Sequence, residues 1–157
     1  DEVDGYPLHP GFEASWPMLR ALLPVRPALV IDAANVVGSV PDGWWRDRVG
    51  AAERLLTSVQ GLLRRGVDAA TLGLAADRWF PEASVVVEGQ ARGAAEVDGI
   101  RLVRAEGHGD DAIVAEAERL AAEGRAVTVV TSDRELSRRA DAVGAAIRPV
   151  SWLRDQL

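Results

Sequence analysis

The sequence has no cysteine, no lysine and only two histidines, His9 and His108. The lack of cysteine excludes disulfides and thiolate metal sites, and two histidines are too few for a histidine-based zinc site without carboxylate help. No apolar run approaches the roughly 20 residues that a membrane span needs. No basic segment followed by an apolar one resembles a signal peptide. We therefore expect a cytoplasmic protein with no membrane partner.

The balance of residue types is that of an ordinary soluble domain. Of the 157 residues, 48% are hydrophobic and 27% are charged, and the length fits one domain with a core of its own. The net charge of -6 argues against a protein that binds nucleic acid over its whole surface, but not against a protein with one local nucleic-acid site. All 18 basic residues are arginines, which suit bidentate phosphate contacts.

The chain divides into a leader and one domain. Five prolines and two glycines in residues 1–27 predict an irregular leader. The apolar runs beyond it predict strands at residues 29–32, 84–88, 100–104, 126–130 and 146–148. The helical spacing predicts helices at residues 44–65, from about 110 to Gly124, at 134–142 and at 151–157.

This order of elements predicts the fold class. Residues 67–81 fit either a strand or a short helix, and the alternation in residues 100–104 indicates an edge strand. Strands and helices that alternate with short connections predict an α/β domain over residues 28–157, in which a mainly parallel sheet of about five strands lies between helix layers.

The first strand of this sheet stops abruptly at Asp32, and Asn35 follows three residues later. In a parallel sheet, ligands bind at the carboxyl ends of the strands. Asp32 could hold a cation there, and Asn35 could orient Asp32 or donate to a substrate oxygen. Both residue types also suit turns and helix caps for purely local reasons.

Further acids follow the other strands: Asp110 with Asp111, Asp133 and Glu88. Asp110 is a natural helix N-cap, but two adjacent acids exceed what capping needs. Clustered carboxylates repel one another and are costly to bury. A divalent cation resolves both problems, and oxygen ligands favour Mg²⁺ or Mn²⁺.

The acid at residue 133 also has a local alternative. Ser132 and Glu135 have the spacing of a capping box, so the helix that follows has a predicted cap without Asp133. Asp133 could likewise help to cap this helix, although Ser132 already can, and it could serve as a metal ligand.

The substrate contacts have two interpretations each. Trp44 and Trp45 could stack bases, or they could cover the start of a helix. Arg46 and Arg134, like other arginines, could bind phosphates or form a solvated helix face. We take Trp45, Arg46 and Arg134 as the candidate substrate-binding residues, and we interpret His108 as a loop residue.

Three segments resemble motifs of the PIN-like nuclease superfamily, and in particular of its NYN branch. LVIDAAN at residues 29–35 is similar to the opening D-x-x-N signature. GDDAIVAEA at residues 109–117 resembles the motif in which an acid starts a helix, and VVTSD at residues 129–133 resembles the late strand that ends in T-x-D. The resemblance spans residues 28–148.

This resemblance implies a Rossmann-like three-layer αβα sandwich and a metal-dependent ribonuclease. Asp32 and Asp133 would bind the metal by position, together with Asp111 or Asp110, because the helix motif fits either register. Asn35 would fill the asparagine position of the family. The usual mid-chain acid has no clear match, and Glu88 is the second-tier candidate.

We therefore predict an endoribonuclease dependent on Mg²⁺ or Mn²⁺ that hydrolyses phosphodiester bonds of single-stranded RNA, with Asp32, Asn35, Asp111 and Asp133 as catalytic residues. RNA is the expected partner, and a homo-oligomer is compatible with the sequence. One alternative is a degenerate, non-catalytic PIN-like module that binds RNA or protein, which the net charge and the missing acid favour. The other is a metal-dependent phosphatase of small molecules, although Ala34 stands where an aspartyl nucleophile at Asp32 would need a second acid.

Overall fold

The computed structural model describes residues 2–3, 6–7, 26–74 and 77–157. Most of the predicted leader, residues 1–27, lies outside the described residues. Its described part includes a two-stranded antiparallel sheet of β1 (Glu2–Val3) and β2 (Tyr6–Pro7). The irregular leader therefore stays a prediction.

The centre of the domain is a five-stranded sheet in the order β7-β6-β3-β8-β9, and every neighbouring pair is parallel. The strands are β3 (Pro27–Asp32), β6 (Glu82–Val87), β7 (Ile100–Arg104), β8 (Ala126–Val130) and β9 (Ala146–Arg148). The predicted sheet is confirmed, and β7 is the edge strand that its alternation indicated.

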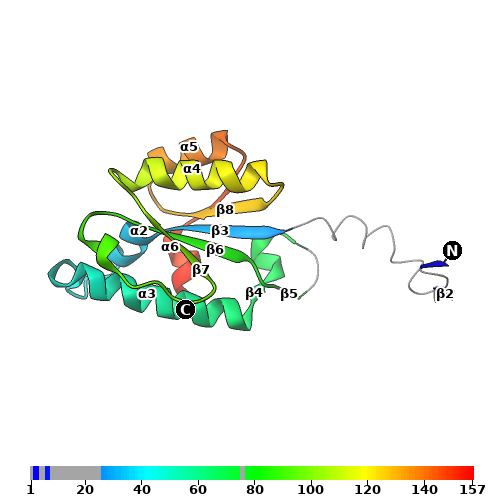
Figure 1. Ribbon diagram of the computed structural model, residues 1–157, viewed down its shortest axis with the longest axis horizontal. Coiled ribbons are helices and arrows are strands. Elements are labelled where there is room, and N and C mark those ends of the chain that lie inside the picture. The colour runs from blue at the N-terminus through cyan, green and yellow to red at the C-terminus, as the bar shows by residue number, and fades with distance from the viewer. Residues whose placement is uncertain (1, 4–5, 8–25, 75–76) are drawn as a thin grey trace.

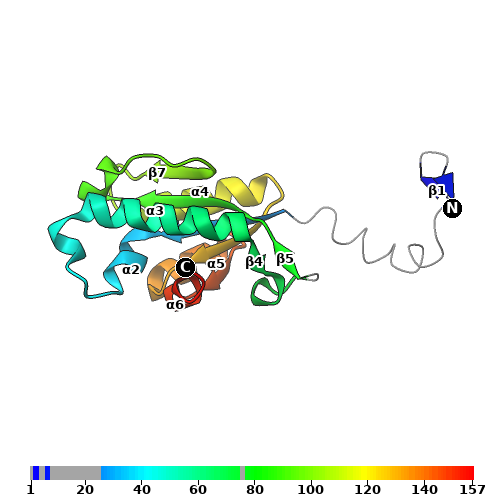
Figure 2. The ribbon, with the colours of Figure 1, turned by 90° about the horizontal axis from the view of Figure 1, so that it is seen from below.

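Helices cover both faces of this sheet (Figures 1 and 2). One layer contains α2 (Ala33–Gly38), α3 (Arg48–Arg65) and α6 (Val150–Arg154), and the other contains α4 (Gly109–Ala122) and α5 (Arg134–Ala142). This is the predicted three-layer αβα sandwich. In the described part of the chain, no helix is both long and apolar enough to cross a membrane.

The two layers explain why the central strand is apolar throughout. Leu29 and Ile31 pack toward α3, whereas Ala28 and Val30 pack toward α4 and α5. Strands buried on both faces are continuous apolar runs rather than alternating ones. In such a strand the polar side chains lie at the ends, and Asp32 is the last residue of β3.

Several predicted elements have other bounds in the structure, and the main differences lie in three segments. The helix predicted from residue 44 starts at Arg48, because Trp44–Arg46 forms a separate 3₁₀ turn, η1, and Asp47 caps the helix through Gly50 N. The ambiguous segment contains β4 (Val67–Asp68), the 3₁₀ turn η2 (Ala69–Leu72) and β5 (Arg78–Trp79). The last helix is Val150–Arg154 rather than residues 151–157.

A buried carboxylate, Glu116, ties α4 to the sheet. It is 5% exposed, and it accepts hydrogen bonds from Ser84 Oγ at 2.7 Å and from Arg119 at 2.7 and 3.1 Å. Arg101 Nε lies 3.1 Å from the same carboxylate. Burial by itself raises the pKa of Glu116, but the hydrogen bonds from Arg119 and Ser84 and the arginine charges outweigh it, so the pKa lies below its ordinary value of 4.5.

We predict that Glu116→Gln lowers the free energy of unfolding at neutral pH by about 1–3 kcal/mol, because it removes a hydrogen-bonded buried charge. A lowered folded-state pKa means that the charge stabilises the protein above pH 4.5, and that this contribution is lost as the pH falls through the folded-state pKa. The measurement is urea unfolding of both proteins at several pH values.

The matched control is Glu118→Gln, at an exposed position of the same helix, which should change stability by less than about 0.5 kcal/mol. An equal loss in both variants, or a loss for Glu116→Gln that does not shrink at low pH, would contradict the prediction.

Candidate active site

The strand order creates a crevice at the carboxyl edge of the sheet. From β3 at the centre, the chain runs outward to β6 and β7, and it then returns to β8 on the other side of β3. The connections that follow β3 and β8 thus leave the sheet in opposite directions. Such a switch point is where open parallel sheets bind ligands.

Polar contacts join the ends of β3 and β8 at this point. Asp32 is 8% exposed, and its two oxygens accept hydrogen bonds from Asn35 N at 3.2 Å and from Thr131 Oγ1 at 3.0 Å. The Asn35 side chain accepts in turn from Ser132 N at 2.8 Å. Asp32 therefore caps α2 and is held in place from the neighbouring strand.

Asp133, which follows β8, caps α5, a role that the sequence motif assigned to Ser132. Asp133 is the N-cap of α5, and its Oδ1 accepts from Leu136 N at 2.8 Å. The predicted capping box of Ser132 and Glu135 is wrong, because Ser132 Oγ instead accepts from Val150 N at 3.1 Å.

The structure separates the two adjacent acids of α4. Its N-cap residue is His108, so the expectation that Asp110 is the N-cap is wrong. Asp111 is exposed and forms an ion pair with Arg139 at 2.7 Å. Asp110 instead lies in the electrostatic neighbourhood of Asp32 and Asp133.

Glu88, which follows β6, accepts a hydrogen bond from Gly109 N at the start of α4. A Cβ atom at Gly109 would lie 2.6 Å from Glu88 Oε2, so a side chain at this position would displace the end of the Glu88 side chain. Glu88 thereby extends from its own strand to the helix that carries Asp110.

The carboxylates act on one another. Burial raises the pKa of Asp32, and the charges of Asp110 and Glu88 raise it further, although the hydrogen bonds from Asn35 and Thr131 oppose this. Burial and the charges of Asp133 and Glu88 likewise raise the pKa of Asp110, although the charges of Arg139 and His108 oppose this. Among the described residues, however, no three Asp, Glu or His side chains converge closely enough to form a ready-made metal site.

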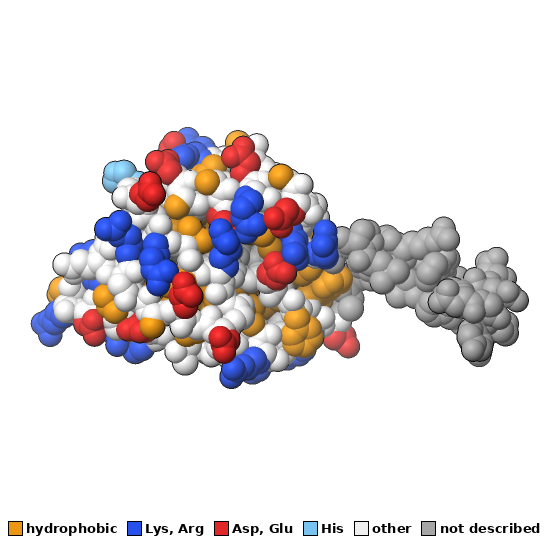
Figure 3. Space-filling view, in the orientation of Figure 1, with side chains coloured by type: hydrophobic (Ala, Val, Ile, Leu, Met, Phe, Trp, Pro, Cys, Tyr) orange, Lys and Arg blue, Asp and Glu red, His pale blue; other side chains and the backbone are white. Residues whose placement is uncertain are grey.

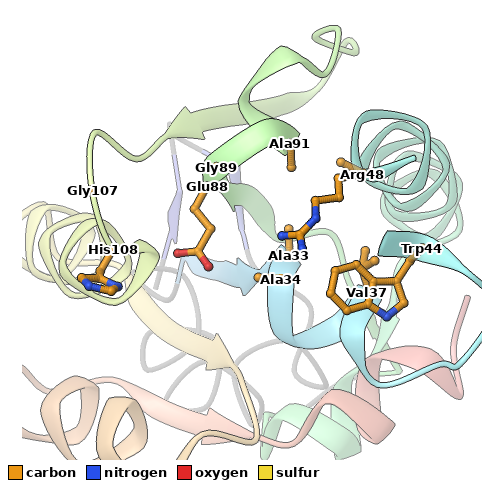
Figure 4. A pocket seen from close by; sticks show the side chains of 11 residues that line it. Ala33, Ala34, Val37, Trp44, Arg48, Glu88, Gly89, Ala91, Gly107 and His108 are labelled. Carbon is orange, nitrogen blue, oxygen red and sulfur yellow. The ribbon is translucent and has the colours of Figure 1, made fainter. Parts of the chain in front are cut away.

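A cavity of about 410 Å³ lies beside these acids (Figure 4). Trp44 and Arg48 are on one side of it, and Glu88 and His108 are on the other. The Arg48 guanidinium lies 5.1 Å from the centre of the Trp44 ring, a cation–π distance.

The three predicted substrate-binding residues do not line this cavity. Trp45 is half-exposed with Arg46 over its ring, and neither residue lines this cavity. Arg134 is an exposed residue at the start of α5. Sequence reasoning considered Trp44 for base stacking but did not choose it over Trp45. It missed the contact that Thr131 makes to Asp32, for which the T-x-D motif was the available signal.

No protein-family model and no curated protein matches the chain. Among solved structures, the chain is similar to Rae1 (YacP) from Bacillus subtilis, in a crystal structure of a variant of that protein. The TM-score is 0.56, the sequence identity is 16%, and the match covers 82% of this chain and 74% of the Rae1 chain. At this identity the likeness concerns the fold, and the sheet with its flanking helices is PIN-like.

We predict that Asp32→Asn is at least as stable as the wild type at neutral pH. A raised folded-state pKa means that the charged form destabilises the folded protein, and this cost appears as the pH rises through the folded-state pKa. Asparagine removes the charge and keeps the cap. Asp32→Ala loses the cap and should be about 1 kcal/mol less stable than Asp32→Asn.

Thermal unfolding of the three proteins over a range of pH measures this order, and the advantage of Asp32→Asn should shrink toward low pH. If both variants were equally destabilised at neutral pH, the Asp32 charge would be a stabilising one, contrary to this account.

Proposed function

We propose that this protein is an endoribonuclease that hydrolyses phosphodiester bonds of single-stranded RNA with the help of Mg²⁺ or Mn²⁺. The observation that carries the proposal is the gathering of four carboxylates, from Asp32, Glu88, Asp110 and Asp133, in one electrostatic neighbourhood at the switch point of the sheet. The PIN-like fold supports a nuclease, as do the three sequence motifs.

The donor chemistry fits a hard divalent cation. All four side chains offer oxygen, and their mutual repulsion is the kind that a cation relieves. Asp32, Asp110 and Asp133 would hold the ion, with Glu88 as a further donor, and the bound ion would supply a water of lowered pKa and positive charge against the phosphodiester. Because no three donors converge among the described residues, the other acids would have to move toward Asp32 on binding.

The surrounding residues prepare the site without the ion. Thr131 and Asn35 N hold both oxygens of Asp32, so little side-chain freedom remains to be lost on binding. One oxygen of Asp133 caps α5, which leaves the other for a ligand. The Asn35 carbonyl is engaged by Ser132 N, so its amide NH₂ is the group available to a phosphate oxygen.

We predict that Asp110→Asn abolishes Mn²⁺ binding and RNA cleavage, whereas Asp111→Asn retains both, because Asp111 is paired with Arg139 outside the carboxylate group. Calorimetric titration with Mn²⁺ and a cleavage assay on labelled single-stranded RNA measure the two effects. The two positions are adjacent on one helix, so each variant is the control for the other.

Equal behaviour of Asp110→Asn and Asp111→Asn would contradict the assignment to Asp110. A wild-type protein that binds RNA but neither binds Mn²⁺ nor cleaves RNA would contradict the proposed function. That result would favour the degenerate binding module, an alternative that the lack of three convergent donors in the described chain already supports.

We also predict that Thr131→Val lowers Mn²⁺ affinity by about 10–100-fold, the usual effect of losing a hydrogen bond that orients a metal ligand. Valine keeps the shape of this buried residue and removes the donor to Asp32. Thr131→Ser, which keeps the hydroxyl, should restore most of the affinity. If serine and valine reduced it equally, the effect would come from packing and not from the hydrogen bond.

A further inference from the structure

The cavity beside the acids shares a wall with them. Glu88 lines it, and its charge also reaches Asp32 and Asp110. Ala33 and His108, which also line the cavity, lie next to Asp32 and two residues before Asp110 in the chain. The part of an RNA strand that adjoins a nucleotide bound in this cavity would therefore lie close to the carboxylates of Asp32 and Asp110.

The lining combines three kinds of surface. Small apolar side chains such as Ala33, Val37 and Ala91 leave the space open, and the volume of about 410 Å³ is within the range of small-ligand pockets. Trp44 supplies a flat aromatic wall, and Arg48 supplies a positive charge beside it (Figure 4). An aromatic ring next to an arginine offers stacking to a base and charge to its phosphate.

The charge distribution favours a local site over a continuous basic surface. The net charge is -6, and basic and acidic side chains are interspersed over the face seen in Figure 3. Binding of a polyanion by a continuous basic surface does not fit this pattern. A pocket that takes one nucleotide by stacking and a single arginine does.

We propose that this cavity binds one unpaired nucleotide of the RNA, with its base against Trp44 and its phosphate at Arg48, so that the adjoining phosphodiester reaches the carboxylates. This inference rests on the proposed function and adds the subsite that selects single-stranded substrate. A paired base cannot enter, because its face and edge are already occupied in the duplex.

Two tryptophan–arginine pairs in one short segment provide a matched comparison. Arg48 lies over Trp44 at 5.1 Å and lines the cavity, whereas Arg46 lies over Trp45 at 5.9 Å and does not. Both pairs have the same chemistry and differ in position. The inference assigns the substrate to the first pair and not to Trp45 and Arg46.

The experiment measures the anisotropy of a fluorescein-labelled, single-stranded RNA of mixed sequence with EDTA present. Trp44→Ala should weaken binding by about tenfold or more, the usual effect of losing a stacked base, and Trp45→Ala by less than about twofold. Trp44→Phe, which keeps a stacking face, should restore most of the affinity. Equal losses in the two alanine variants, or no rescue by phenylalanine, would overturn the proposal.

The phosphate contact has its own readout. Arg48→Gln should reduce the slope of log affinity against log salt by about 0.7, the effect of one contact to a single strand, and Arg46→Gln should leave the slope unchanged. Stronger displacement of the labelled RNA by adenosine monophosphate than by unlabelled RNA would reassign the pocket to free nucleotides and overturn the proposal.

Binding in EDTA separates this inference from the proposed nuclease. If the wild type fails to bind Mn²⁺ or to cleave, the nuclease is refuted, while a loss specific to Trp44→Ala still supports the pocket. If the wild type cleaves RNA and Trp44→Ala binds as well as Trp45→Ala, the pocket alone is refuted.

Discussion

The parallel pairing of β3 with β8 is the contact on which the rest of the site depends. Their register places Ile31 beside Val130, so the residues that follow, Asp32 and Thr131, meet at the end of the sheet and form a hydrogen bond. The link from Asn35 to Ser132 repeats this connection one step further from the sheet. Asp32 and Thr131 are 99 residues apart in the chain. Their two segments thus form one wall of the crevice.

The sequence was sufficient for the central sheet and its longer helices, because their signals are local, but it did not predict the short helix α2. Apolar runs that end on acids, alternating with helical patterns, predicted the strands, the layers and the side of the sheet on which the acids lie. It was not sufficient for the caps, because Ser132 and Asp133 both suit the start of α5. Which of the two residues caps the helix depends on Val150, in a distant part of the chain, because its N–H donates a hydrogen bond to Ser132 Oγ.

The remaining differences concern the direction of neighbouring side chains. In a 3₁₀ turn such as Trp44–Arg46, successive side chains point about 120° apart, so a Trp-Trp pair does not reveal which ring faces a cavity. Asp110 and Asp111 present the same problem on a helix. Arg139, 28 residues from Asp111, forms an ion pair with that acid, and no pattern within residues 109–117 contains this information.

The close approach of Glu88 to Gly109 links two positions in evolution as well as in space. A side chain at residue 109 would displace the Glu88 carboxylate from this contact, so we expect a lineage that keeps the contact to keep the glycine, and a lineage that loses the acid to be released from it. The two positions should therefore change together among descendants of a common ancestor. A glycine directly before the position of Asp110 would then identify the members of such a group that retain the carboxylate of Glu88.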